Sequence, residues 1–367
     1  MLSRVEAWIG EGIEQGLHTG AQLCVSREGQ TVAALAVGEA SPGHAMTDQS
    51  IALWMSSGKP VTAVAITQLV EQGEIEWDDP VAAFLPGFAA HGKGDITVRH
   101  LLTHTAGIRT ARFKFPRDDW DTIIAAICDT QPEWAAGQGA GYHVQTSWFI
   151  LGELVRLVDG RTIDTYVREE VFLPLGMLDS WLGMPTDVYE RYEAAGRLLA
   201  MPSTATSEIR ASGLTGPDWS TRPRPGGNCM GPISELVRFY EMLLAGGVSG
   251  EGERLLQAET VELMTGRRRT EMLDQTFKSV VDWGLGFVIN SAHHAPGGDA
   301  GLVPYGYGDH ASRETFGHGG AQSSVGFADP DHGLAVGVVF NGMPGEIGHQ
   351  RRMHALLTAL YEDLGLA

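Results

Sequence analysis

One serine–lysine pair in this sequence has a spacing that could support acyl-transfer chemistry. Ser56-Ser57-Gly58-Lys59 places a hydroxyl three residues before an amine. If a helix starts here, three residues are nearly one turn, so both side chains share a face and the amine can approach the hydroxyl. Pro60 is tolerated because first-turn N–H groups have no intrahelical acceptor. The pattern predicts Ser56 as a nucleophile at a helix N-terminus, where free N–H groups can stabilise an anion.

The context of Lys59 strengthens this interpretation. The chain has 26 basic residues but only four lysines, and with 19 serines about 0.2 Ser-x-x-Lys spacings are expected by chance. The residues that follow are apolar on nearly all sides of the predicted helix, so we expect it to be buried. Burial lowers the pKa of a lysine and could make it a base.

Composition narrows the class of partner. The 367 residues carry a net charge of −19, which disfavours nucleic acid and anionic membranes as partners and favours a small-molecule substrate. The arginine-rich, lysine-poor composition suggests a bacterial source. Residues 1–17 lack the apolar core of a signal peptide, and no stretch is long and apolar enough to span a membrane, so we predict a cytoplasmic protein. The sequence does not define an oligomeric state.

The periodicity predicts an α/β fold. An amphipathic helix near each end flanks strands at 21–25, 31–37, 323–328 and 334–340, which form an antiparallel sheet. Helical periodicity dominates between them, at 56–72, 120–128, 147–158, 163–172 and 233–244. Residues 202–227 are predicted to be a long loop bordering a site. We therefore predict a sheet domain from 1–55 and 285–367, a mainly helical domain at 56–284, and a site between them.

Several further motifs carry a family resemblance over nearly the whole chain. They are Ser56 to Lys59 with Pro60-Val61-Thr62-Ala63, Asp79-Pro80-Val81, Leu85-Pro86, Ile96 to Ile108, Trp283-Gly284-Leu285-Gly286-Phe287 and Gly317-His318-Gly319-Gly320-Ala321. With them the sequence resembles the serine β-lactamase and penicillin-binding-protein superfamily, in its class C β-lactamase-like branch, which includes family VIII carboxylesterases. The resemblance implies the β-lactamase/transpeptidase-like fold, with Ser56 acylated and Lys59 as its activator.

The resemblance also assigns a second catalytic element. Members of the superfamily carry Tyr-x-Asn on a loop of the helical part, and the matching residues here are Tyr142-His143-Val144. Tyr142 is then the general acid/base partner of Ser56. Val144 replaces the asparagine that helps to hold the substrate amide in β-lactamases. The resemblance still implies that Val144 lies in the substrate-binding site.

The third element lies on a strand that lines the site. His318-Gly319-Gly320 stands where β-lactamases carry Lys-Thr-Gly, and two glycines at a strand edge let a substrate approach closely. The resemblance implies that these three residues bind the substrate and that the N–H groups of Ser56 and Ala321 form the oxyanion hole. An imidazole instead of a permanent cation weakens the case for binding a β-lactam carboxylate.

No cofactor or metal is predicted. Cys24, Cys128 and Cys229 lack metal-ligand spacing and are expected to be buried free thiols. His100 and His104 are expected to be structural, and His293-His294 to be solvated in a loop.

These features predict a metal-independent serine hydrolase that forms an acyl-enzyme, most consistent with a carboxylesterase. An acyltransferase, a β-lactamase or D-aminopeptidase-like amidase, and a non-catalytic binding protein of the same fold remain as alternatives.

Overall fold

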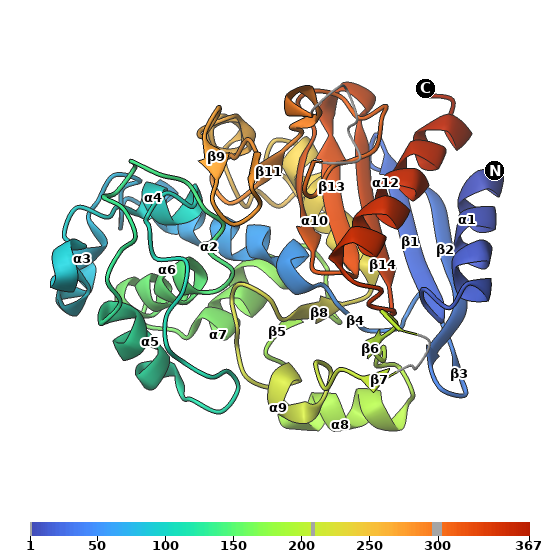
Figure 1. The fold of residues 1–367 in the computed structure, drawn as a ribbon, viewed down its shortest axis with the longest axis horizontal. Helices are drawn as coiled ribbons and strands as arrows, with labels where there is room; N and C mark the ends of the chain where they lie inside the picture. Colours follow the sequence, from blue (N-terminus) through green and yellow to red (C-terminus); the bar gives the residue numbers. More distant parts are fainter. Residues whose placement is uncertain (1, 207–209, 296–302) are drawn as a thin grey trace.

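Within the residues that the computed structural model describes, 2–206, 210–295 and 303–367, both chain ends join in one seven-stranded antiparallel sheet (Figure 1). The strand order is β11-β12-β13-β14-β1-β2-β3. Their bounds are β1 Gly20–Arg27, β2 Gln30–Ser41, β3 His44–Ala45, β11 Val288–Ile289, β12 Phe316–Gly320, β13 Ser324–Asp329 and β14 Leu334–Phe340. The predicted α/β fold with a central antiparallel sheet is confirmed.

Turn residues explain the two hairpins that build the sheet. Strands β1 and β2 are joined at Glu28 and Gly29, which have φ values of 52° and 74°. Between β13 and β14, a 3₁₀ turn at Pro330–His332 ends at Gly333, with a φ of 59°. Positive φ is the conformation that a tight turn needs and that glycine adopts readily. Both predicted hairpins are therefore present.

Helices cover both faces of the sheet. Helix α1 (Ser3–Glu14) and helix α12 (Glu346–Asp363) bury their apolar sides against one face of the sheet. Leu23 of β1 belongs to the same buried cluster. Helix α10 (Ile233–Leu244) covers the other face so closely that a Cβ at Gly337 would lie 2.9 Å from an Ile233 side-chain carbon. The range 56–284, predicted as the helical domain, thus includes a helix that belongs to the sheet layer. The amphipathic periodicity of α10 indicates that one side of the helix is buried, but not which part of the protein that side packs against.

Most of the helical part lies beside the sheet, on the left in Figure 1, and its helices at 186–194 and 217–220 lie at the bottom of that view. Its helices are α2 Lys59–Glu71, α3 Val81–Phe84, α4 Val98–Leu102, α5 Trp120–Cys128, α6 Thr146–Val158, α7 Ile163–Val167, α8 Thr186–Ala194, α9 Pro217–Ser220 and α11 Ala258–Thr265. Helix α2 is buried over most of its surface, as its apolar sequence predicts. A π-helical turn at Arg168–Phe172 extends α7 to the predicted end at residue 172.

Short strands complete the framework. They are β4 Ala52–Leu53, β5 Trp181–Leu182, β6 Pro202–Ser203, β7 Arg210–Ala211, β8 Cys229–Gly231, β9 Leu273–Asp274 and β10 Ser279–Val280. Strands β6 and β7 and helix α9 fall in the segment predicted as one long loop. Strand β4 pairs with β8 and leads directly into the Ser56 segment. None of the helices in the described ranges combines the length and apolarity needed to cross a bilayer.

Candidate active site

The Ser56 turn is a strained, closely packed segment. Ser56 lies in a 3₁₀ turn, Met55–Gly58, that continues as α2. Met55, just before it, has a φ of 50°, a conformation that a residue with a side chain adopts only when its surroundings impose it. A Cβ at Gly58 would lie 2.6 Å from the Cβ of Cys229, so only glycine permits this approach to β8. The packing therefore fixes the position of the Ser56 hydroxyl.

Ser57 attaches this turn to the sheet. Its Oγ donates a 2.9 Å hydrogen bond to the backbone oxygen of His318 in β12 and lies 3.1 Å from the Oγ of Ser324 in β13. Ser324 in turn donates to the backbone oxygen of Trp54. Sequence reasoning missed this contact, because Ser57 and His318 are 261 residues apart. Through it the first helical turn and the substrate strand are held as one unit.

Lys59 is fully enclosed beside the hydroxyl. Its Nζ donates a 3.0 Å hydrogen bond to Ser56 Oγ and another to the backbone oxygen of Gly226. The amine also lies 5.1 Å from the ring centre of Tyr142 and 5.5 Å from that of Trp148. Burial lowers the pKa of Lys59 well below its ordinary value, and the charge of Arg224 adds to this shift. The environment thus favours the neutral amine, which can accept a proton.

Tyr142 reaches the site from the loop between α5 and α6. Its backbone N–H donates a 3.0 Å hydrogen bond to Asp274 Oδ1, and Asp274 pairs with Arg269 at 3.1 Å, with both side chains buried. The Tyr142 Oη has no hydrogen-bond partner among the described residues. Burial raises the pKa of Tyr142, and the neighbouring Ser56 hydroxyl offsets part of the rise. The phenol therefore holds its proton next to the serine.

Two buried histidines support the Tyr142 loop. His143 Nε2 accepts the Ile108 N–H at 3.0 Å, so its Nδ1 carries the hydrogen and donates to His104 Nδ1 at 3.2 Å. Burial lowers the pKa of His143 to about 3 and that of His104 well below 6.5. Both are neutral structural groups. His100 caps α4 together with Thr97, so the structural interpretation of His100 and His104 is confirmed.

His318 faces the same space from β12. Its ring centre lies 5.8 Å from that of Tyr142, and burial lowers its pKa well below the ordinary value, with a further contribution from the charge of Lys59. Its Nδ1 lies 2.6 Å from the Gly319 oxygen, which can only accept, so Nε2 is unprotonated. This Nε2 is buried with no partner among the described residues. His318 thus offers an uncharged acceptor in place of a cation.

The remaining predicted residues are Gly319 and Gly320 in β12, Ala321 directly after it, and Val144, two positions after Tyr142. The Tyr305 ring occupies the space where a Cβ of Gly319 would lie, and a Cβ at Gly320 would lie 2.4 Å from the Trp54 oxygen. Ala321 follows β12, and among the described residues its N–H has no hydrogen-bond acceptor; the same holds for Ser56. Both groups are thus available for an oxyanion. The side chain of Val144 is 44% exposed at the surface.

Arg224 is a site residue that the sequence analysis missed. It lies within the predicted loop 202–227, two residues before Gly226, and stacks on Trp219 with its Cζ 4.8 Å from the ring centre. Its Nε is buried without a partner among the described residues. Its charge lowers the pKa values of both Lys59 and Tyr142. A single arginine in a polar loop gives no signal that it would lie near a lysine 165 positions away.

Two sequence expectations need correction. His293 and His294 do not simply face solvent: their Nε2 atoms lie 3.5 Å and 3.0 Å from the carboxylate of Asp282. A loop sequence could not show this partner, because the contact depends on how the chain folds back. Cys128 is only half-buried, at the end of an amphipathic helix, whereas Cys24 and Cys229 are buried as expected; all three are free thiols.

The fold is the β-lactamase and penicillin-binding-protein architecture, and the arrangement around Ser56 contains the groups that a serine hydrolase needs. The chain belongs to the Beta-lactamase family, whose sequence profile matches residues 5–360.

Solved structures and curated sequences agree with this assignment. A penicillin-binding protein homologue from Caulobacter crescentus has a TM-score of 0.81 at 28% identity, covering 98% of this chain and 97% of that one. A family VIII carboxylesterase has a TM-score of 0.79 at 26% identity, with the same coverage of both chains. The esterase/β-lactamase LipL of Mycobacterium tuberculosis is 26% identical over 78% of this chain.

The curated relatives are longer than this chain. It spans 68% of the length of LipL and 66% of Penicillin-binding protein 4 of Amycolatopsis lactamdurans, to which it is 29% identical over 70% of its own length. These named organisms are bacteria, in keeping with the composition. The cytoplasmic location stays a prediction.

Proposed function

We propose that this protein is a carboxylesterase that forms a covalent acyl-enzyme on Ser56. The observation that carries the proposal is the fully buried Lys59, whose Nζ lies 3.0 Å from Ser56 Oγ and whose pKa is lowered well below its ordinary value. A serine hydroxyl is a weak nucleophile until an adjacent base takes its proton. A neutral amine at hydrogen-bond distance provides that base.

The reaction follows from the positions of the groups. Lys59 Nζ takes the proton as Ser56 Oγ attacks the ester carbonyl, and the N–H groups of Ser56 and Ala321 stabilise the oxyanion. One such donor is worth about 2.7–4 kcal/mol in the transition state. Tyr142 then gives its proton to the leaving alkoxide, and Lys59 returns one to Tyr142. Water attacks the acyl-enzyme by the same steps in reverse and releases the acid.

The character of His318 supports an ester rather than a β-lactam substrate. A β-lactam carboxylate would need a cation at this strand, and His318 is neutral because burial lowers its pKa. The tyrosine, whose pKa is raised, suits protonation of an alkoxide. The family VIII carboxylesterase is named for esterase activity, in line with this proposal, and LipL is named for both esterase and β-lactamase activity.

Steady-state kinetics with p-nitrophenyl esters and a chromogenic cephalosporin test the proposal. We expect kcat/KM for the best ester to exceed that for the cephalosporin, and Tyr142→Phe to reduce ester turnover by about 10²-fold or more. Tyr166→Phe is a matched control, because Tyr166 is a buried tyrosine of α7 whose hydroxyl also lacks a partner among the described residues. Faster cephalosporin turnover, or equal effects of the two substitutions, would contradict the proposal.

A further inference from the structure

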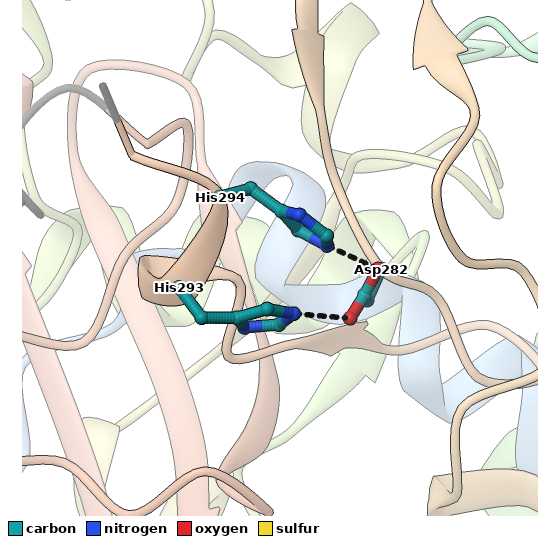
Figure 2. A group of neighbouring side chains, drawn as sticks. All are labelled: Asp282, His293 and His294. Carbon is teal, nitrogen blue, oxygen red and sulfur yellow. Dashed lines mark hydrogen bonds and ion pairs between the residues drawn. The ribbon is translucent and has the colours of Figure 1, made fainter. Parts of the chain in front are cut away.

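Two consecutive histidines converge on one buried carboxylate outside the active site. His293 and His294 lie in a 3₁₀ turn, Ala292–His294, and both rings point toward Asp282 on the neighbouring segment (Figure 2). The His294 Nε2 is 3.0 Å from Asp282 Oδ1, and the His293 Nε2 is 3.5 Å from Oδ2. The ring centres are 3.9 Å apart. One ligand atom from each residue therefore lies within 4.8 Å of the others.

The carboxylate is held in place by its surroundings. Arg267 Nε lies 2.9 Å from Asp282 Oδ2, and the Asp282 N–H donates a 2.8 Å hydrogen bond to Ser291 Oγ. Arg267 also pairs with Glu314 at 2.7 Å, so its positive charge is shared between two carboxylates. The oxygen that Arg267 does not contact is Asp282 Oδ1. Partners of this kind orient a metal-binding carboxylate in known sites.

The separations between these groups are close to those between ligands of a tetrahedral ion. Zinc–nitrogen and zinc–oxygen bonds of about 2.0–2.2 Å place two ligand atoms about 3.3–3.6 Å apart across a tetrahedral angle. The His293 nitrogen lies 3.5 Å from Asp282 Oδ2 and the His294 nitrogen lies 3.0 Å from Asp282 Oδ1, and one ligand atom from each of the three residues lies within 4.8 Å of the others, so small side-chain rotations bring all three onto one ion. Imidazole nitrogens with one carboxylate suit Zn²⁺, Co²⁺ or Ni²⁺ far better than Mg²⁺ or Ca²⁺, which prefer oxygen ligands.

We infer that Asp282, His293 and His294 form a binding site for a divalent transition-metal ion such as Zn²⁺, with water as the fourth ligand. The His293 side chain is 37% exposed, so solvent can reach the ion. Before binding, each Nε2 carries the ring hydrogen and directs it at Asp282; on binding, this hydrogen is lost from Nε2, the neutral ring carries its hydrogen on Nδ1, and the freed Nε2 lone pair binds the ion.

The location gives the ion a structural role. Asp282 directly precedes Trp283, whose ring centre lies 5.8 Å from that of Tyr142 and 5.6 Å from that of His318. An ion joining Asp282 to the 292–294 turn would stabilise the segment that carries Trp283 without touching Ser56 or Lys59. This site is independent of the esterase proposal.

Calorimetric titration of the chelator-treated, full-length protein with Zn²⁺ tests the inference, with Mg²⁺ titrated in parallel. We expect one tight Zn²⁺ site per chain, no tight Mg²⁺ site, and a higher melting temperature with Zn²⁺. His293→Gln and His294→Gln should each weaken Zn²⁺ binding by at least about 10-fold, the smallest loss seen even for partners outside the ligand shell.

His91→Gln is the matched control, because His91 pairs with the carboxylate of Asp129 at 3.0 Å but belongs to no group of three possible metal ligands among the described residues. It should bind Zn²⁺ as the wild type does. Near-UV circular dichroism checks that each variant is folded, and the visible absorption of bound Co²⁺ gives a second readout of the site. If His293→Gln and His294→Gln bind Zn²⁺ as tightly as His91→Gln, or the wild type binds none, the inference is wrong.

Discussion

Replacing Asp274 by Asn should destabilise the protein by removing one charge from a buried ion pair. Asp274 Oδ2 pairs with Arg269 at 3.1 Å, and the two side chains are only 0% and 1% exposed. Oδ1 accepts the N–H groups of Tyr142, Thr276 and Phe277. An Asn side chain can keep Oδ1 in place but turns an NH₂ group toward the guanidinium. The substitution therefore removes the charge and retains most of the shape.

The magnitude follows from leaving the Arg269 charge unpaired. Losing one partner of a buried ion pair costs about 3–5 kcal/mol. Arg269 keeps hydrogen bonds to the backbone oxygens of Thr103 and Val281, both at 3.0 Å, so we expect the lower end, about 3 kcal/mol. Urea unfolding followed by tryptophan fluorescence measures the change as a shift in midpoint at constant slope.

Asp78→Asn gives the matched control. Asp78 pairs with Arg99 at 2.7 Å, but the two side chains are 69% and 33% exposed. Exposed pairs contribute about 0–1 kcal/mol, so this variant should unfold close to the wild-type midpoint. If Asp274→Asn costs no more than Asp78→Asn, the buried pair does not hold the Tyr142 loop as described.

Three other perturbations test separate parts of the account. Because the charge of Arg224 lowers the pKa of Lys59, Arg224→Met should raise that pKa and move the acidic limb of the kcat/KM profile to higher pH, whereas Arg224→Lys should leave it in place. Gly320→Ala should abolish ester turnover, because its Cβ would lie 2.4 Å from a backbone oxygen, while Gly87→Ala, whose Cβ meets nothing within 4 Å, should not. Burial lowers the pKa of His143 from 6.5 to about 3, so protonation of this side chain favours the unfolded chain. The contribution of His143 to stability should therefore be present above pH 6.5 and be lost progressively as the pH falls toward 3. The melting temperatures of the wild type and His143→Gln should converge over that range.

Local patterns predicted much of the framework. The helical spacing of Ser56 and Lys59 predicts that their side chains share a face, and the structure places them in contact. Turn residues located both hairpins, and the helices at 120–128 and 233–244 have the predicted bounds. Such features depend on neighbours within a few residues, which a single sequence displays.

Contacts between residues far apart in the sequence could not be predicted from these local patterns. The bond between Ser57 and His318, the Asp274 acceptor of Tyr142 and the approach of Arg224 to Lys59 join segments more than 130 residues apart. Each side chain alone has many possible partners, and only the folded backbone selects one. The tyrosine was found only through its family motif, since an isolated Tyr in a loop indicates packing as readily as catalysis.

Covalent trapping of Ser56 tests the central claim most directly. The protein is treated with a fluorophosphonate, and intact mass and peptide mapping locate the adduct in the wild type, Ser56→Ala and Ser57→Ala. Ser57 is the matched neighbour, because its hydroxyl already donates to the His318 backbone oxygen. The account predicts one adduct on Ser56 in the wild type and in Ser57→Ala, and none in Ser56→Ala. Labelling that persists unchanged in Ser56→Ala would contradict it.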